Sequence, residues 1–154
     1  MPVDVRTEIE IARPRDAVAA FAADPDNATA WYQNIKAVDW RTQRPLQVGS
    51  RVAFVAQFMG RRLSYTYEIA DFEPGVRLVM RTANGPFPME TTYTWTDAAA
   101  DATTMTLRNR GEPSGFARVT APMMARAIQR ANRNDLRQLK LILEGAGGRQ
   151  PAGA

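Results

Sequence analysis

The sequence predicts an α+β domain in which seven antiparallel strands form one curved sheet and a long C-terminal helix lies across it. Apolar and polar residues alternate in seven segments, which is the period of half-buried strands. Six of these segments follow one another through short turns and therefore form an antiparallel meander. The last segment is amphipathic with helical spacing over about 28 residues, long enough at about 1.5 Å per residue to cross the concave face of such a sheet.

The N-terminal part contains one strand and two short helices. Alternation predicts the first strand at Val3–Ile11. A helix follows at Pro14, because proline suits the first turn of a helix, and it ends near Asp24. A second short helix then carries Trp31 and Tyr32 at its end.

The middle of the chain reads as the six strands of the meander. Alternation and turn residues place them at residues 35–41, 50–59, 63–69, 76–82, 89–96 and 103–109. Gly60-Arg61, Glu73-Pro74-Gly75 and Asn84-Gly85-Pro86 mark turns between them.

One long helix is expected from about residue 116 to residue 144. Its apolar face, at steps of three and four, contains Ile128, Asn132, Leu136, Leu139 and Leu143. Pro122 falls near its start and predicts a kink or a separate leading turn there. Residues 1–144 are therefore expected to form a single domain, and residues 145–154 a disordered tail.

The amino-acid composition excludes several kinds of catalytic and metal-binding site. The chain of 154 residues has neither cysteine nor histidine, which removes thiolate nucleophiles, the usual metal ligands and the usual neutral-pH proton shuttle. No phosphate loop, catalytic triad or metal-ligand spacing is present, so we expect no cofactor and no metal. No apolar run is long enough to span a membrane and no leader segment is evident, which predicts a cytoplasmic protein.

The positive charge is concentrated at the C-terminus. Residues 1–113 carry a net charge of −1 and residues 114–154 a net charge of +5. The basic residues with helical spacing are Arg118, Arg126, Arg130, Arg133, Arg137 and Lys140. They form either an electropositive face for phosphate, nucleic acid or anionic lipid, or the solvated side of an amphipathic helix. The second interpretation is favoured and no nucleic-acid partner is expected, since no aromatic residues interleave with the arginines.

Strand parity predicts which strand side chains face the long helix, and helical spacing predicts which helix side chains face the sheet. The candidate ligand-binding residues are Phe54, Phe58, Tyr65, Tyr67, Met80, Met89, Tyr93, Trp95, Met105, Asn109, Met124, Ile128 and Asn132. Either these side chains line a pocket, with hydroxyl and amide groups that orient a ligand, or they are core residues whose polar groups are satisfied internally.

Three tyrosines are the candidate catalytic residues. Tyr65, Tyr67 and Tyr93 are protonated near neutrality and could donate a hydrogen bond to a carbonyl oxygen. Glu68 and Glu90 have outward parity, and no carboxylate is expected to face inward as a general base.

Several stretches together resemble the START/Bet v 1-like (SRPBCC) superfamily, in particular its bacterial polyketide cyclase/dehydrase and lipid-transport branch. The resemblance covers about residues 3–144. The stretches that carry it are Ile11-Ala12-Arg13-Pro14-Arg15-Asp16-Ala17-Val18 with Phe21, Asp24-Pro25 and Trp31; the hairpin from Val48-Gly49-Ser50-Arg51 to Gly60; Tyr67-Glu68-Ile69 with Glu73-Pro74-Gly75-Val76-Arg77-Leu78; and Leu136-Arg137-Gln138-Leu139-Lys140 to Glu144.

This resemblance implies a helix-grip fold with a mostly apolar pocket. The implied function is binding or transport of a small hydrophobic molecule such as a lipid, polyketide or isoprenoid, by a monomer or homodimer that allows transient membrane contact. One alternative is a polyketide cyclase or dehydrase that uses the pocket tyrosines, and another is an interaction module like the chaperone activators of this fold. The chain lacks the glycine-rich loop of the plant pathogenesis-related members and the Cys and His ligands of Rieske oxygenase subunits.

Overall fold

A computed structural model describes residues 3–58, 60–82, 88–112 and 121–148. Its strands form one antiparallel sheet in the order β1-β7-β6-β5-β4-β3-β2. The strands are β1 (Val3–Ile11), β2 (Ile35–Trp40), β3 (Arg51–Phe58), β4 (Arg61–Glu73), β5 (Arg77–Thr82), β6 (Met89–Ala99) and β7 (Ala102–Gly111). The predicted α+β helix-grip fold with a seven-stranded curved sheet is confirmed.

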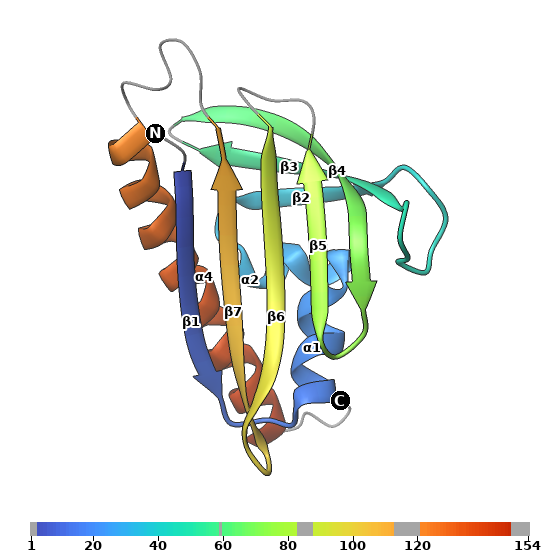
Figure 1. Cartoon of the computed structure of the whole chain (residues 1–154), viewed down its shortest axis with the longest axis vertical. Coiled ribbons are helices and arrows are strands. Elements are labelled where there is room, and N and C mark those ends of the chain that lie inside the picture. The colour runs from blue at the N-terminus through green and yellow to red at the C-terminus, as the bar shows by residue number, and fades with distance from the viewer. Residues whose placement is uncertain (1–2, 59, 83–87, 113–120, 149–154) are drawn as a thin grey trace.

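The helices all lie on the inner side of the curved sheet (Figure 1). They are α1 (Arg15–Ala23), the single turn η1 (Pro25–Asn27), α2 (Ala28–Trp31) and α4 (Ala121–Gly148). The long helix α4 packs along β1 and also contacts α2, whereas α1 contacts β6 and β7. In Figure 1, α4 runs behind β1 and β7, with its N-terminal end at the top.

The first and last strands are neighbours. β1 pairs with β7 along its whole length, from Val3 opposite Gly111 to Ile11 opposite Thr103. This pairing adds the N-terminal strand to the end of the β2–β7 meander. The edge strands of the sheet are therefore β1, which α4 covers, and β2.

Three details differ from the sequence prediction. β4 is longer than expected. Its first part pairs with β3 and its last part pairs with β5, and the pairing with β5 contains a register shift between Ile69 and Asp71. Pro122 lies in the first described turn of α4, where a missing N–H costs no hydrogen bond. The helix then continues past Glu144 to Gly148; the rest of the predicted tail and any turn before Ala121 lie outside the described residues.

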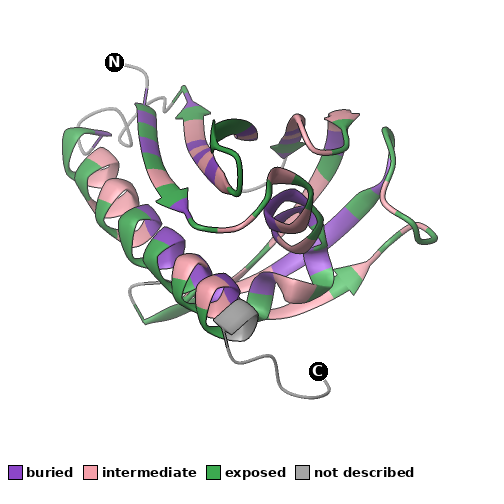
Figure 2. Cartoon of the chain, turned by 90° about the horizontal axis from the view of Figure 1, so that it is seen from below, coloured by how far each residue is buried: buried purple, intermediate pink, exposed green. Residues whose placement is uncertain are grey.

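The core fills the lower part of the molecule, where α1 and the C-terminal half of α4 meet the sheet (Figures 1 and 2). Trp31, Trp95, Met105 and Leu107 are at most 1% exposed. The helical face predicted for α4 is confirmed, since Asn132, Leu136, Leu139 and Leu143 are buried and Ile128 is half-buried. Among the described helices, none has both the length and the hydrophobicity needed to span a membrane.

Polar contacts fasten the C-terminal half of α4 to the end of β1. Glu144 accepts a hydrogen bond from the Ala12 backbone N–H at 2.7 Å and pairs with Lys140 at 2.6 Å. Lys140 also donates to the Glu10 carbonyl, and Arg13 donates to the Leu143 carbonyl at 2.9 Å. The Lys140 ammonium and the Ala12 N–H hold the pKa of Glu144 below its usual range.

Candidate functional site

Strand pairing brings the predicted ligand-binding residues side by side on the inner face of the sheet. Phe54 of β3 lies opposite Tyr65 of β4, and Asn109 of β7 lies opposite Thr91 of β6. Thr91 in turn lies opposite Met80 of β5. Since directly opposite residues of antiparallel strands point to the same face, these side chains belong to one continuous wall.

Burial separates the predicted residues into two groups. The buried group contains Phe54, Met80, Tyr93, Trp95, Met105 and Asn132. The half-buried group contains Tyr65, Tyr67, Met89, Asn109, Met124 and Ile128. Phe58 ends β3, and its side chain lies outside the described residues.

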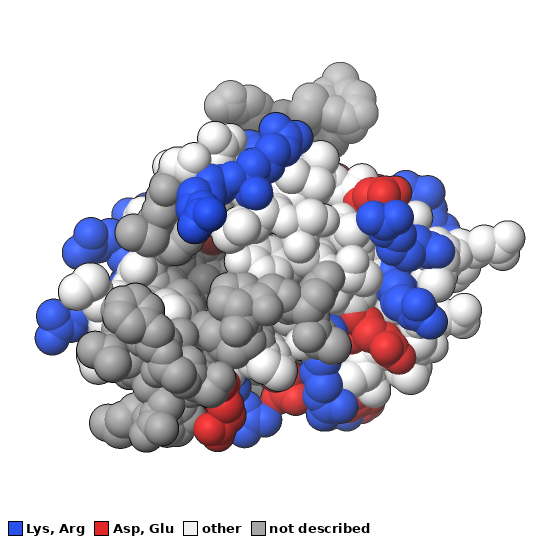
Figure 3. Space-filling view, turned by 90° about the horizontal axis from the view of Figure 1, so that it is seen from above, with Lys and Arg blue, Asp and Glu red and all other residues white. Residues whose placement is uncertain are grey.

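The half-buried group gathers at the upper end of the molecule in Figure 1, where β6 and α4 begin and β7 ends. Met89 is the first residue of β6, Asn109 lies two residues before the end of β7, and Ile128 lies in the N-terminal part of α4. Figure 3 views this end: charged side chains gather around the rim, and the described atoms near the centre belong mainly to uncharged residues. The side chains of this upper part of the wall are half-buried: Met124 and Ile128 pack against Val3 and Val5 of β1, and Tyr67 packs against the main core.

A chain of polar side chains crosses this wall. Asn132 of α4 donates to the Asn109 side-chain oxygen at 2.6 Å, and Asn109 donates to the Thr91 hydroxyl at 2.9 Å. Burial raises the pKa of Tyr67. A hydrogen bond between the Thr91 and Tyr67 side chains lowers this pKa by a smaller amount. The pKa of Tyr67 remains above its ordinary value, so its hydroxyl stays protonated and able to donate at neutral pH.

A second polar pair lies deeper in the wall. The hydroxyl oxygens of Tyr32 and Tyr93 are 2.5 Å apart. Burial raises the pKa of both tyrosines well above the ordinary value. The Trp31 ring packs on Tyr32 with centroids 4.1 Å apart, and Trp95 meets Tyr93 edge-on at 6.0 Å.

One carboxylate faces inward, which corrects the prediction that none would. Asp135 of α4 is 3% exposed, and its Oδ1 accepts a hydrogen bond from the Gln33 backbone N–H at 3.0 Å. Burial raises the pKa of Asp135 to about 6, and the charge of Asp135 in turn raises the pKa values of Tyr32 and Tyr93. Asp135 and Tyr32 also line a polar surface groove of about 470 Å³ between α2 and α4.

Helical spacing could have revealed Asp135 but not Tyr32. Asp135 follows Asn132 by three residues and precedes Leu139 by four, the same spacing that predicted the buried face. Its charge suggested exposure, and burial at this position is decided by α2 packing against α4. Tyr32 meets a residue 61 positions away, and no local pattern reports such a contact.

Two buried indole groups have no hydrogen-bond partner among the described residues. They are the Nε1 atoms of Trp31 and Trp95, both within the aromatic cluster around Tyr93. Leaving such a donor unsatisfied costs about 1–3 kcal/mol. The inner wall therefore contains two buried N–H donors that no described residue satisfies.

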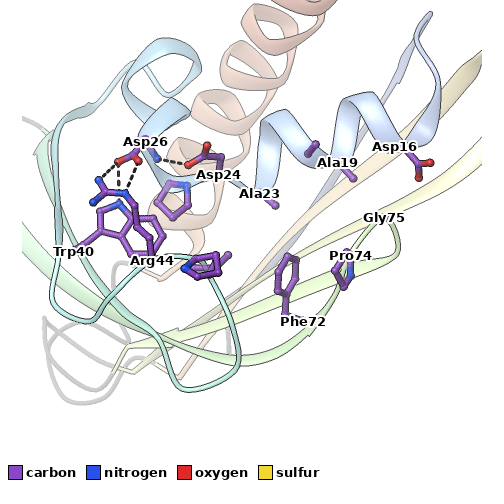
Figure 4. Close-up of a pocket in the computed structure, with 14 residues that line it drawn as sticks. Asp16, Ala19, Ala23, Asp24, Asp26, Trp40, Arg44, Phe72, Pro74 and Gly75 are labelled. Atoms are coloured by element: carbon purple, nitrogen blue, oxygen red, sulfur yellow. Dashed lines mark hydrogen bonds and ion pairs between the residues drawn. The ribbon is translucent and has the colours of Figure 1, made fainter.

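A separate groove of about 550 Å³ lies between α1, the loop after β2 and the turn between β4 and β5 (Figure 4). Ala19 and Ala23 of α1 face Phe72 and Pro74 across it. At one end Arg44 pairs with Asp26 at 3.1 Å and lies 4.7 Å from the centre of the Trp40 ring. Local sequence patterns do not predict this groove, because its walls come from segments that meet only in the fold.

The groove adjoins a small inner cavity of about 20 Å³, roughly the space of one water molecule. Both are lined by Ala23, Asp24, Pro25 and Leu46. The inner cavity is also lined by three predicted ligand-binding residues, Phe54, Met80 and Tyr93. The packed side chains around Leu46 therefore separate the outer groove from the inner wall of the sheet.

Charged residues on the outer face of the sheet pair with one another. Glu90 bonds Arg110 and Arg81, which hold its pKa below the usual range, and Arg108 pairs with Asp4 at 2.7 Å. These pairs agree with the outward parity expected for Glu90. In the described ranges, no three acidic side chains come together as metal ligands.

Comparison with known families finds one match along nearly the whole chain. The family described as "Polyketide cyclase / dehydrase and lipid transport" matches residues 2–144. Among curated protein sequences no relative matches significantly.

Solved structures with similar folds come from several bacteria. The protein TTHA0849 from Thermus thermophilus is 18% identical with a TM-score of 0.79, over 93% of this chain and 98% of that one. The Zhui aromatase/cyclase from Streptomyces sp. R1128 is 17% identical with a TM-score of 0.77, over 95% and 96%. A START superfamily protein from Mycobacterium smegmatis is 16% identical with a TM-score of 0.68, over 92% and 94%. At these identities the likeness concerns the fold.

Proposed function

Because the chain belongs to the polyketide cyclase/dehydrase and lipid-transport family, we propose that it binds a small, mostly apolar molecule between the sheet and α4. A lipid, polyketide or isoprenoid-like molecule fits this description. The proposed contact surface is the half-buried upper part of the inner wall, with Tyr65, Tyr67, Met89, Asn109 and Ile128.

The observation that carries the proposal is the polar chain on this wall. A wall that served only as core would be stabilised as well by apolar side chains, because each buried polar group must find a partner. Here Asn132, Asn109, Thr91 and Tyr67 are held in fixed orientations by one another. Tyr67 ends this chain, its ring meets the buried Phe54 edge-on, and its hydroxyl is suited to orienting one ligand oxygen.

The first experiment identifies the ligand class. Native mass spectrometry of the purified protein should show a bound molecule, and an environment-sensitive apolar dye should compete with it for one saturable site. A protein that retains no small molecule and binds neither fatty acids nor aromatic polyketides would contradict the proposal.

The second experiment locates the site with a matched pair of variants. Thr91→Val keeps the side-chain volume but removes the hydroxyl between Asn109 and Tyr67, so it should weaken an oxygen-bearing ligand about 2- to 12-fold, the worth of one hydrogen bond. Thr92→Val, one residue away on the outer face, should leave affinity unchanged. Equal effects of the two variants would place the ligand elsewhere, and thermal melting checks that both are folded.

The second candidate function is a cyclase or dehydrase, and Asp135 is the observation that favours it. A carboxyl group with a pKa of about 6 is suited to accept a proton near neutral pH. In an aldol ring closure it would take the proton from a carbon next to a carbonyl, while Tyr32 donates a hydrogen bond to the carbonyl oxygen. The resulting enolate carbon would bond to a second carbonyl carbon, whose oxygen then takes the proton.

Turnover of a poly-β-keto substrate tests this second function. Asp135→Asn should lower kcat at least 100-fold with KM nearly unchanged, and Tyr32→Phe should lower kcat less. If the wild-type protein binds the substrate without turnover, the protein acts as a binder. Normal turnover by Asp135→Asn would instead exclude Asp135 as the base.

A further inference from the structure

The outward side of α4 carries a line of basic residues that the proposed ligand site does not use. The four arginines Arg126, Arg130, Arg133 and Arg137 are all exposed and follow one another at steps of four, three and four residues. At 3.6 residues per turn these steps place them within about 60° of the helix circumference. We call these four residues the arginine ridge; Figure 2 shows the exposed positions along this side of α4.

The arginine ridge forms no ion pairs within the described part of the chain; Glu8 of β1 lines a groove with Arg133 and Arg137 but pairs with Arg6. Its four guanidinium groups form no ion pair or side-chain hydrogen bond there. The fifth basic residue on the described part of this helix, Lys140, is different because it bonds Glu144 and the Glu10 carbonyl. Asp135, the acidic residue nearest in sequence, faces inward. The positive charge of the ridge is thus directed at solvent.

Exposed apolar side chains stand at both ends of the ridge. Met123 is 72% exposed and Leu141 is 62% exposed. Helical geometry places both on the same side as the arginines, within an arc of about 80°, and about 27 Å apart along the axis. Uninterrupted helix joins them, so the four cations and the two apolar side chains face one direction.

The arginines also enclose a shallow hollow. This hollow, of about 350 Å³, is lined by Arg126, Gln129, Arg130, Arg133, Asn134 and Arg137. Every one of these side chains carries N–H donors, and guanidinium groups match the oxygens of a phosphate in a bidentate fashion. The hollow therefore suits a phosphate group on an extended surface.

We propose that the arginine ridge docks this protein on an anionic phospholipid surface. The ridge supplies positive charge for the headgroup phosphates, and Met123 and Leu141 supply apolar contacts at the two ends. A line of side chains that all face one direction matches a plane. Nucleic acid is disfavoured, because residues 121–148 contain no aromatic side chain for base stacking. Docking requires no ligand and is independent of the proposed function.

Vesicle co-sedimentation of the full chain tests the proposal. The probes are vesicles of phosphatidylcholine alone and vesicles with about one third phosphatidylglycerol, at low and high salt. Wild-type protein should bind only the anionic vesicles, and less tightly at high salt. Each basic side chain near such a surface is worth about fivefold in affinity, so Arg130→Glu/Arg133→Glu should bind at least tenfold more weakly.

A control variant with the same change in charge separates location from net charge. Arg51→Glu/Arg61→Glu reverses two exposed arginines on the sheet and, like the ridge variant, brings the net charge from +4 to 0. Its affinity for the anionic vesicles should stay within about threefold of wild type, because salt screens charges that lie more than about 10 Å from the vesicle surface. A third variant, Met123→Ser/Leu141→Ser, should weaken binding to the anionic vesicles without changing its salt dependence.

Three results would overturn the proposal. The first is absence of wild-type binding to anionic vesicles at low salt, and the second is equal loss in the ridge and control variants. The third is ridge-dependent binding of polyglutamate with no binding of vesicles, which would assign the ridge to an acidic protein. Melting curves that match the wild type establish that every variant is folded.

Discussion

At the scale of single residues, Asp135 has the most distinct pH behaviour. Its pKa is raised from 3.8 to about 6 in the folded protein. Between pH 3.8 and pH 6, the folded state therefore keeps a proton on Asp135 that the unfolded state has lost. Stability from this residue is therefore present below about pH 4 and is lost as the pH rises to 6. A shift of this size corresponds to about 3 kcal/mol at most.

Asp135→Asn should consequently stabilise the protein at neutral pH. The neutral amide has no charge to bury and can still accept the hydrogen bond from Gln33 N–H. We expect the free energy of unfolding at pH 7.5 to rise by about 1–3 kcal/mol, with little difference from wild type at pH 4, as measured by urea titration. The control, Asp101→Asn, makes the same chemical change at an exposed position and should leave the free energy of unfolding at pH 7.5 within about 0.5 kcal/mol of wild type. If the difference in the free energy of unfolding between Asp135→Asn and wild type were the same at every pH, the pKa of Asp135 would not differ between the folded and unfolded states.

At the scale of elements, the two sides of α4 differ sharply in what they contribute. Leu139 is fully buried against the core, and Leu141 is 62% exposed on the opposite side. Leu139→Ala should lower the free energy of unfolding by about 2–5 kcal/mol, because it removes buried surface and leaves a cavity. Leu141→Ala makes the same chemical change and should stay within about 0.5 kcal/mol of wild type. Similar losses for the two variants in chemical denaturation would show that Leu139 and Leu141 do not lie on opposite sides of the helix, one buried and one exposed.

The end of α4 adds a second, polar attachment. Glu144 holds both Lys140 and the Ala12 backbone N–H, so Glu144→Gln should destabilise the protein at pH 7 by about 1 kcal/mol. The lowered pKa of Glu144 gives the sign of the pH dependence: its contribution is present above about pH 4.5 and is lost as the pH falls. The difference between variant and wild type in urea titration should therefore shrink towards pH 3. A difference that grows at low pH would contradict the attachment.

At the scale of the whole molecule, ligand binding and folding are coupled. A molecule that binds only the folded protein, at about 100 times its Kd, stabilises it by about 2.7 kcal/mol. For a domain of about 150 residues this corresponds to an increase in Tm of about 5–10 °C. The molecule identified by native mass spectrometry should produce this increase in a thermal melt, and Thr91→Val should reduce it. No increase at saturating concentration would show that the molecule is not bound at a site that folding creates.

Much of the fold could be predicted because it depends on short-range periodicity. Alternation placed β1 at Val3–Ile11 without error, and steps of three and four identified Asn132, Leu136 and Leu139 on the buried side of α4. Burial on one side is what produces these periods, so they can be read from neighbouring residues. The family resemblance, now confirmed, supplied the order in which the elements pack.

The polar features of the candidate site depended instead on contacts between distant parts of the chain. Tyr32 and Tyr93 are separated by 61 positions, and Gln33 and Asp135 by 102. Periodicity reports the face on which a side chain lies, but not which side chain it meets across the core. The sequence by itself therefore determined the strands, the buried face of α4 and the basic residues on its outer side. Only the tertiary structure decided that Asp135 is buried beside two tyrosines, that Asn132 reaches Tyr67 through Asn109 and Thr91, and that the arginine ridge forms no ion pair with any described residue. The physical reason is that packing sets these distances after the local structure has formed.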